Sequence, residues 1–233
     1  MILGMSDRAS NVCAGPFGSF YDFYIERPRL MRLIGRAVWG IDASILYASM
    51  ETIRYAAPGA TILDVPCGGG VAFRALRPDQ DVRYTAADLS LKMLERAERR
   101  ARRRSLKQVE FVAADMTALP FGDGEADLFL SYSGLHMVDE PEKAVREIAR
   151  CLKPDGEVIG TSFFLDGSKR ARLLFELGAR RGHALPPSRE DVRRWLTSAG
   201  LAEPTIGRQP GFAAFSAKKG PAMTRSGQPQ SRD

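Results

Sequence analysis

The chain has 233 residues, 44% of them hydrophobic and 27% charged, and a formal net charge of +6. This length and composition predict one substantial core, and therefore one domain with a small extension. No apolar run approaches the ~18 residues of a membrane span, and the first residues lack the basic and apolar regions of a secretory signal, so neither feature is expected.

Three cysteines, Cys13, Cys67 and Cys151, are widely spaced and form no CxxC pair. Their odd number and their spacing argue against a disulfide framework and against a zinc site, so no metal is expected. Such a chain suits a reducing compartment, which predicts a cytoplasmic protein.

Much of the positive charge lies at the end of one predicted helix, within residues 96–107. A solvated helix face with cations near its C-terminus is the simpler interpretation. A basic patch for an acidic membrane surface or a phosphate-bearing substrate is the alternative, so weak contact with a membrane surface stays open. No aromatic residues interleave with the arginines, and no specific nucleic-acid partner is expected.

The N-terminal part of the chain divides into two segments. Residues 1–16 are small, polar and unpatterned, which predicts a flexible end. Residues 17–57 are predicted to form a helical lid, with Pro28 in the first turn of a helix. The apolar positions that fall on one face of this helix are Leu30, Leu33, Ile34, Ala37, Val38 and Ile41.

A glycine-rich turn follows the first predicted strand. Residues 62–65 are a short apolar run around one acid, Asp64, as in a buried parallel strand, and the glycines at 68–70 follow directly. Such a turn brings a ligand close to backbone N–H groups. A second predicted strand, residues 82–88, ends in Asp88 roughly 20 residues after the glycines, where an acid can bind ribose hydroxyls.

Strands alternate with helices through the rest of the chain. Further strands are expected at residues 109–114, 126–132, 157–164, 202–207 and 211–217, and helices at residues 90–107, 141–149, 166–182 and 188–199. This alternation predicts the α/β class, with a doubly wound, mostly parallel sheet. A helix can also start at residues 71–76, directly after the glycines, and residues 153–156 are predicted to form a turn. Ser188 with Asp191 resembles a capping signal for the last helix. The tail, residues 218–233, is rich in Gly, Pro, Ser and Gln and is predicted to be disordered.

Three motifs, at residues 64–70, 87–94 and 114–116, resemble those of class I S-adenosylmethionine-dependent methyltransferases. The closest branch acts on small molecules and includes ubiquinone and menaquinone biosynthesis. The resemblance implies a Rossmann-like domain over residues 58–217, with seven strands, a reversed C-terminal hairpin and N-terminal lid helices. Pro66 departs from the family, which usually has glycine there. Because proline fixes φ near −65° and lacks an N–H, we expect a slightly altered turn that still binds the cofactor.

The resemblance also implies a site for S-adenosylmethionine at the carboxyl ends of the first four strands. Asp88 would accept hydrogen bonds from both ribose hydroxyls, with capping of the next helix as the alternative. Asp115 would accept from the adenine amine, with a turn role as the alternative, and Asp64 would organise the glycine turn and seat the methionine end. The whole predicted cofactor set is Asp64, Pro66, Cys67, Gly68, Gly70, Asp88, Leu89, Met93, Asp115, Met116 and Ser131.

The reaction that the resemblance implies is in-line methyl transfer to a small, hydrophobic or lipid-like acceptor. His136 is the best candidate for a general base, because it follows the fourth strand and an imidazole titrates near neutrality. Packing beneath the loop is its alternative role. Phe20, Tyr21 and Tyr24 are candidates for the substrate pocket, with packing onto the sheet as the alternative.

Other classes of protein compete with this interpretation. A non-catalytic, regulatory S-adenosylmethionine-binding protein is the main one. A nicotinamide-dependent oxidoreductase is disfavoured because no GxGxxG motif follows the first strand. A nucleic-acid methyltransferase is disfavoured because residues 131–134 read Ser-Tyr-Ser-Gly where an Asn-Pro-Pro-aromatic motif would stand.

Overall fold

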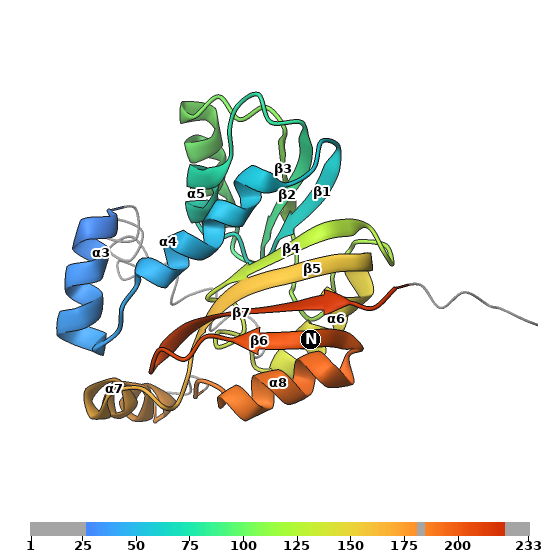
Figure 1. Cartoon of the computed structure of the whole chain (residues 1–233). Helices are drawn as coiled ribbons and strands as arrows, with labels where there is room; N and C mark the ends of the chain where they lie inside the picture. Colours follow the sequence, from blue (N-terminus) through green and yellow to red (C-terminus); the bar gives the residue numbers. More distant parts are fainter. Residues whose placement is uncertain (1–26, 181–184, 222–233) are drawn as a thin grey trace, which may run out of the picture.

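A single sheet organises the computed structural model, which describes residues 27–180 and 185–221. Within these residues the sheet has seven strands in the order β3-β2-β1-β4-β5-β7-β6 (Figure 1). The strands are β1 (Ala60–Asp64), β2 (Val82–Asp88), β3 (Val109–Ala113), β4 (Ala126–Tyr132), β5 (Leu152–Phe163), β6 (Leu201–Ile206) and β7 (Phe212–Lys219). β1 to β5 pair in parallel, and β7 runs antiparallel to both β5 and β6. The predicted fold class is confirmed.

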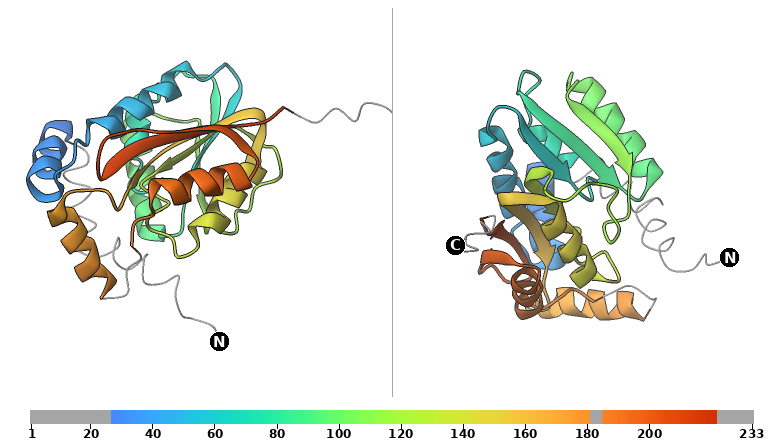
Figure 2. Two further views of the ribbon diagram at one scale, coloured as in Figure 1. Left: turned by 60° about the horizontal axis from the view of Figure 1, so that its bottom comes forward. Right: turned by 90° about the vertical axis from the view of Figure 1, so that its right-hand side faces the viewer.

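Helices cover both faces of this sheet (Figure 2). The helical elements are α3 (Pro28–Ile34), the π-helical η1 (Gly35–Trp39), α4 (Ser44–Met50), the 3₁₀ turns η2 (Glu51–Tyr55) and η3 (Val71–Ala75), α5 (Leu91–Arg103), α6 (Pro141–Cys151), α7 (Lys169–Ala179) and α8 (Arg189–Ser198). α4, η3 and α5 pack in the core on one face, and α6 and α8 pack on the other.

The central strands are apolar on both sides because helices bury both sides. Successive residues of β1 alternate between the two cores: Ile62 lies in the first core beside Tyr84 and Leu128, and Leu63 lies in the second beside Phe129. This alternation is the ordinary geometry of a strand, and it explains why residues 62–65 read as an almost continuous apolar run.

The helix that begins at Pro28 differs from its prediction. Pro28 does occupy the first turn, but the predicted single apolar face is wrong, because Leu33 is 66% exposed and Val38 is 41% exposed while Met31 is buried. The α-helix ends at Ile34 and continues as a π-helical turn. A π turn has more residues than an α turn, so a face projected at 3.6 residues per turn no longer applies after Gly35.

The predicted boundary of the C-terminal tail is also wrong. β7 continues to Lys219, and Lys218 pairs with Glu157 of β5. The Lys219 ammonium donates to the carbonyl oxygen of Leu152 at 2.7 Å, so these lysines belong to the sheet. Residues 222–233, like the predicted flexible end at residues 1–16, lie outside the described residues.

Two local predictions need correction as well. The helix expected after the glycine turn is only the short η3, because Leu76 is already extended and Pro78 follows closely. The turn expected at residues 153–156 lies inside β5 as a bulge: the register with β4 shifts between Ala126 and Leu128, and Asp155 has a φ of 62°.

Among the described residues, no helix connects β3 to β4, and the loop at residues 114–125 is held by Arg150 of α6 instead. The guanidinium of Arg150 donates to the carbonyl oxygens of Phe121 and Leu119, at 2.7 and 3.1 Å. It also pairs with both carboxylate oxygens of Glu147, each at 2.8 Å. Glu147 in turn accepts from the backbone N–H of Leu119 at 2.8 Å, so one ion pair fixes the loop from both sides.

We expect Arg150→Gln to lower the free energy of unfolding by about 1–3 kcal/mol, because it removes the charge-assisted bonds that hold the loop. Urea denaturation measures this change. Arg146→Gln is the matched control, since Arg146 makes one exposed pair with Glu142 on the same helix. Its effect should be about 0.5 kcal/mol or less. Equal effects of the two substitutions would contradict the role given to Arg150.

Candidate active site

The turn after β1 requires glycine at two positions. Gly68 and Gly70 have φ values of 53° and 78°, in the left-handed region that favours glycine. A Cβ at Gly70 would also come within 2.5 Å of the Phe73 ring. The Val65–Pro66 peptide is cis, and the backbone N–H of Cys67 donates to the Ala87 carbonyl at 2.8 Å. The turn therefore accommodates Pro66, and the Cys67 N–H ties it to β2.

Asp88 links the glycine turn to the beginning of α5. One of its carboxylate oxygens accepts from the Gly68 N–H at 2.9 Å, and the other accepts from the Ser90 N–H at 2.8 Å. The spacing of roughly 20 residues between the glycines and Asp88 thus corresponds to a direct hydrogen bond between Gly68 and Asp88. Each carboxylate oxygen has two lone pairs, so capping Ser90 leaves capacity for a ligand hydroxyl.

The end of β3 lies beside the end of β2. The backbone N–H of Ala114 donates to the Asp88 carbonyl at 3.1 Å, which brings Asp115 and Met116 next to Asp88 and Leu89. Asp115 accepts from both the N–H and the hydroxyl of Thr117 at 2.8 Å, which is the turn role foreseen as its alternative. Met93 and Met116 are buried, and Leu89 is exposed.

Asp64 is a buried acid of the site with an incomplete set of hydrogen bonds. Its side chain is 1% exposed, and one oxygen accepts from the Tyr84 hydroxyl at 2.8 Å. The other oxygen has no hydrogen-bond partner within the described structure. Burial raises the pKa of Asp64 to about 7, and the Asp88 charge adds to this, while the Tyr84 bond opposes it. An unpartnered buried carboxylate oxygen is costly, so the position suits a ligand that brings an N–H donor or a cation.

Two further buried oxygens without a partner lie on neighbouring strands, again with respect to the described residues. They are the hydroxyls of Ser131 in β4 and Thr161 in β5, where Ser131 is in register with Gly160. Ser131 belongs to the predicted set. Tyr84 and Thr161 were missed, because the only signal in the sequence was a polar group within an apolar strand.

His136 lies against the end of β5. Its Nδ1 is 3.4 Å from both the Ser162 hydroxyl and the Phe163 backbone nitrogen, and its ring meets the Phe163 ring edge-on at 5.1 Å. Because a backbone N–H can only donate, Nδ1 accepts and the proton of the neutral ring lies on Nε2. Burial lowers the pKa of His136 to about 4. These surroundings favour the packing alternative, and catalysis by His136 stays a prediction.

An aromatic group surrounds the same end of β5. Phe163 contacts Trp39 of η1 and Phe175 of α7, each with ring centroids 5.4 Å apart, and Phe212 of β7 at 4.9 Å. Cys67, by contrast, is a buried thiol whose pKa is raised by burial, as expected for a residue that is not a nucleophile. The predicted pocket residues Phe20, Tyr21 and Tyr24 lie outside the described residues.

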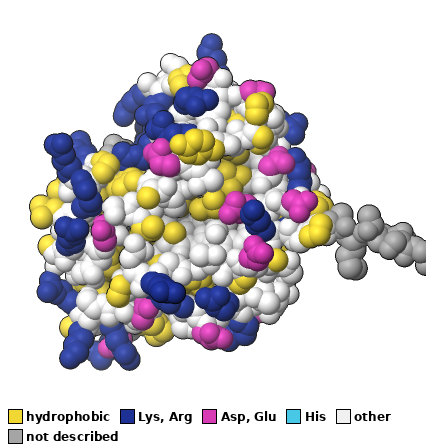
Figure 3. Space-filling model, viewed as in Figure 1, with side chains coloured by type: hydrophobic (Ala, Val, Ile, Leu, Met, Phe, Trp, Pro, Cys, Tyr) yellow, Lys and Arg dark blue, Asp and Glu magenta, His cyan; other side chains and the backbone are white. Residues whose placement is uncertain are grey.

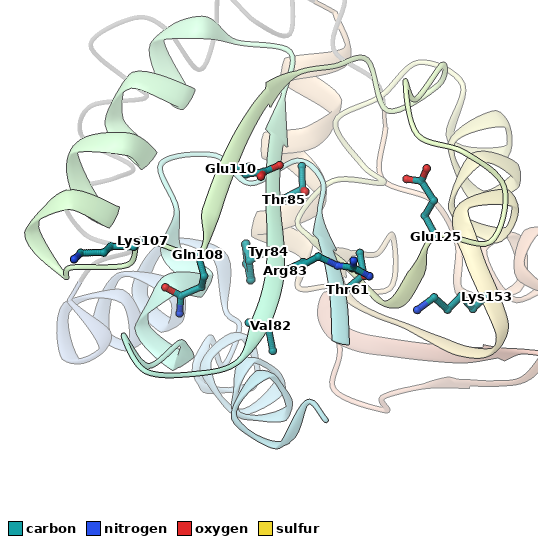
Figure 4. Close-up of a pocket in the computed structure, with 10 residues that line it drawn as sticks. All are labelled: Thr61, Val82, Arg83, Tyr84, Thr85, Lys107, Gln108, Glu110, Glu125 and Lys153. Atoms are coloured by element: carbon teal, nitrogen blue, oxygen red, sulfur yellow. Dashed lines mark hydrogen bonds between the residues drawn. The ribbon is translucent and has the colours of Figure 1, made fainter. Parts of the chain in front are cut away.

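A cavity of about 670 Å³ lies at the other end of the sheet (Figure 4). Thr61, Val82 and Glu110 stand at or near the beginnings of β1, β2 and β3, whereas Gly68, Asp88 and Asp115 lie at or just beyond the ends of these strands. The cavity is lined by Thr61, Val82, Arg83, Tyr84, Thr85, Lys107, Gln108, Glu110, Glu125 and Lys153. Apart from Tyr84, whose hydroxyl donates to Asp64, the cavity shares no residue with the candidate active site.

Comparison with known proteins gives the class of this site. A family model described as a methyltransferase domain matches residues 63–160, which span β1 to β5 and contain the glycine turn, Asp88 and Asp115. Residues 63–160 therefore form a methyltransferase domain, as the resemblance to S-adenosylmethionine-dependent methyltransferases predicted.

The chain is similar to curated methyltransferases whose names give different substrates. It is 37% identical to a demethylmenaquinone methyltransferase of Renibacterium salmoninarum over 108 residues, which cover 46% of this chain and 43% of that protein. It is 31% identical to a malonyl-[acyl-carrier protein] O-methyltransferase of Enterobacter lignolyticus, over 73% of this chain and 61% of that protein. The chain matches about half the length of this demethylmenaquinone methyltransferase and of similar curated relatives.

A solved structure supports the fold over most of the chain. Haemonchus contortus phosphoethanolamine N-methyltransferase 2, in complex with S-adenosyl-L-methionine, matches with a TM-score of 0.71 and 15% identity. The match covers 91% of this chain and 60% of that one. At this identity the likeness concerns the fold alone, including the elements on both sides of the family match.

The Asp64 carboxyl should make stability depend on pH. Because its pKa is raised in the folded protein, the native state binds this proton more tightly than the unfolded chain does. The resulting stabilisation is complete below about pH 4 and is lost as the pH rises to about 7. We expect the wild type to lose up to about 1.4 kcal/mol per pH unit in this window relative to Asp64→Asn, which cannot titrate.

Urea denaturation at a series of pH values, without added cofactor, measures this difference. Asp79→Asn is the control, because Asp79 is exposed and its variant should follow the wild type. Parallel stability curves for the wild type and Asp64→Asn would show that Asp64 ionises normally.

His136 should stay neutral through the range in which an ordinary histidine titrates. The chain has two histidines, so His183→Gln leaves a single imidazole to follow by NMR. We expect no change in its ring signals from pH 8 down to about pH 5, because its pKa is about 4. A titration centred near pH 6.5 would instead restore His136 as a candidate base.

Proposed function

We propose that this chain transfers a methyl group from S-adenosylmethionine to a small hydrophobic acceptor by in-line displacement. The observation that carries the proposal is the Asp88 carboxylate, which is held by the glycine turn and lies at the end of β2. When bound, S-adenosylmethionine supplies an already activated methyl group on its sulfonium. The main task of the chain is then to position donor and acceptor, and orientation alone reaches effective molarities on the order of 10⁵–10⁸ M.

Five residues of the predicted set contact the cofactor directly in this proposal. Asp88 accepts from the ribose hydroxyls, and Asp115 accepts from the adenine amine through the oxygen that Thr117 leaves available. Leu89 and Met116 provide apolar contacts on either side of the base. Asp64 accepts from the amino group of the methionine end with its unpartnered oxygen, which also lowers the cost of burying that oxygen.

The proposed acceptor lies beside the aromatic group of Trp39, Phe163 and Phe175. These rings come from η1, β5 and α7, so the segments on both sides of the family match contribute to acceptor choice. Their apolar character supports a hydrophobic, quinone-like acceptor, as in the demethylmenaquinone methyltransferases that the chain resembles. His136 contacts the same rings and, in this proposal, shapes the acceptor side of the site.

The location of the protein belongs to the proposal too. No helix among the described residues is long and apolar enough to cross a membrane. A cytoplasmic enzyme remains our prediction from the cysteine content. The relatives reported above are methyltransferases by name, which supports an enzyme rather than a regulatory binding protein.

Calorimetric titration with S-adenosylhomocysteine tests the cofactor site. We expect binding by the wild type and a loss of affinity of about 10-fold or more in Asp88→Ala, because hydrogen bonds to a charged group contribute about 1.5–3 kcal/mol. Asp79→Ala, which removes an exposed acid, is the control and should bind normally. If the wild type does not bind, or Asp88→Ala binds like the wild type, the proposed site is wrong. Methylation of a quinol by the binding-competent protein then tests turnover.

A further inference from the structure

Leucine side chains stand exposed on α7, which is the helix that contacts the acceptor side of the site. Leu173 is 55% exposed, and Leu174 and Leu177 are exposed as well. Their spacing of three and four residues places them on one stripe of the helix. Ala171 and Phe175 occupy the opposite, inward stripe, where Phe175 meets Trp39 and Phe163. The helix therefore has two apolar sides. One side packs against the rest of the protein, and the other is exposed to solvent.

The neighbouring α3 and η1 continue the same surface. Leu33 and Val38 are exposed there. η1 is held against the start of α7 by two hydrogen bonds, from the Arg170 guanidinium to the Ala37 carbonyl and from the Ser168 hydroxyl to the Trp39 carbonyl. In Figure 1, α3 and α7 lie one above the other at the left-hand edge of the molecule, and η1 contacts both.

Positive charge surrounds these leucines. The exposed charged residues of the two segments are Arg29, Arg32, Arg36, Lys169, Arg170, Arg172 and Glu176. Glu176 is their single acid and pairs with Arg172, while Arg29, Arg32 and Lys169 form no salt bridge within the part of the chain that the structure describes. In Figure 3, Lys and Arg side chains alternate with hydrophobic ones along the left-hand side, over α3 and α7. Exposed leucines within a ring of cations are complementary to a bilayer that carries anionic lipid.

We propose that α3, η1 and α7 form a surface that docks on anionic membranes. The leucines enter the boundary between headgroups and acyl chains, and the arginines and lysine bind lipid phosphates. This inference rests on the proposed function for its purpose: a lipid-like acceptor would pass from the bilayer along α7 to the rings of Phe175, Trp39 and Phe163. It also places membrane contact here rather than at the basic end of α5, where the sequence first suggested it.

Sedimentation of the full chain with vesicles tests the surface. Vesicles of phosphatidylcholine alone are compared with vesicles that also contain phosphatidylglycerol. We expect binding only to the anionic vesicles, weakened by added salt. Leu173→Gln with Leu177→Gln should bind about 10-fold more weakly, because two leucines no longer enter the bilayer. Arg29→Gln with Lys169→Gln should bind about 30-fold more weakly, since each cation near an anionic surface contributes a factor of about 5.

Control variants place the same changes elsewhere. Leu91→Gln removes a leucine of α5 that is exposed to a similar degree, and Arg99→Gln with Arg103→Gln neutralises two cations of the α5 patch. Both controls should bind anionic vesicles like the wild type. The proposal is overturned if the wild type does not bind these vesicles, if the leucine variant binds normally, or if the controls weaken as much as the test variants.

A second copy of the chain is the other possible occupant of this surface. Analytical ultracentrifugation of the wild type and of the leucine variant distinguishes it, because a dimer that dissociates in the variant would assign the surface to self-association and overturn the proposal. Titration of the same preparations with S-adenosylhomocysteine separates the two proposals. Vesicle binding without cofactor binding would refute only the proposed function, and cofactor binding without vesicle binding would refute only the docking surface.

Discussion

The hydrogen bond from the Gly68 N–H to the Asp88 carboxylate is the interaction on which the site depends. It joins a turn that leaves β1 to the end of the neighbouring strand β2, and the second oxygen of the same carboxylate fixes the beginning of α5. One acid therefore sets the relative positions of three elements at the carboxyl edge of the sheet. The left-handed conformations of Gly68 and Gly70 make this approach possible, because a side chain at either position would be strained.

Buried polar groups without partners lower the stability of the protein when no ligand is bound. The Asp64 carboxyl, the Ser131 hydroxyl and the Thr161 hydroxyl are buried on β1, β4 and β5, and each has an oxygen without a partner in the described structure. By strand alternation, Asp64 and Thr161 share the first face of the sheet and Ser131 lies on the second. A core optimised for stability alone would pair these groups or replace them with apolar ones. Polar groups that stay unsatisfied on neighbouring strands instead indicate that the region serves ligand binding.

The parts that the sequence predicts well are those in which neighbouring residues decide the structure. The glycine turn, Asp88 at the end of its strand and the Ser188–Asp191 capping box all depend on local backbone chemistry, and all are present. The predictions that failed depend on tertiary contacts. The end of β7 is set by pairing with Glu157 and by a carbonyl that accepts from Lys219. The exposed Val38 follows from a π turn that begins at Gly35 and that no periodicity reveals.

The open, polar end of the sheet follows from the short connection between β3 and β4. Because no helix of the described chain covers this part of the second face, the outward positions Arg83, Thr85 and Glu110 are polar, while Val82, Tyr84 and Val109, on the first face, are buried under α5 and η3. The cavity of Figure 4 is thus a consequence of topology. The same short connection explains the contacts of Arg150, since a loop without a helix to pack needs an ion pair to hold Leu119 and Phe121 against α6. The loop contains Asp115, so the contacts that fix it also help to fix the last acid of the candidate site.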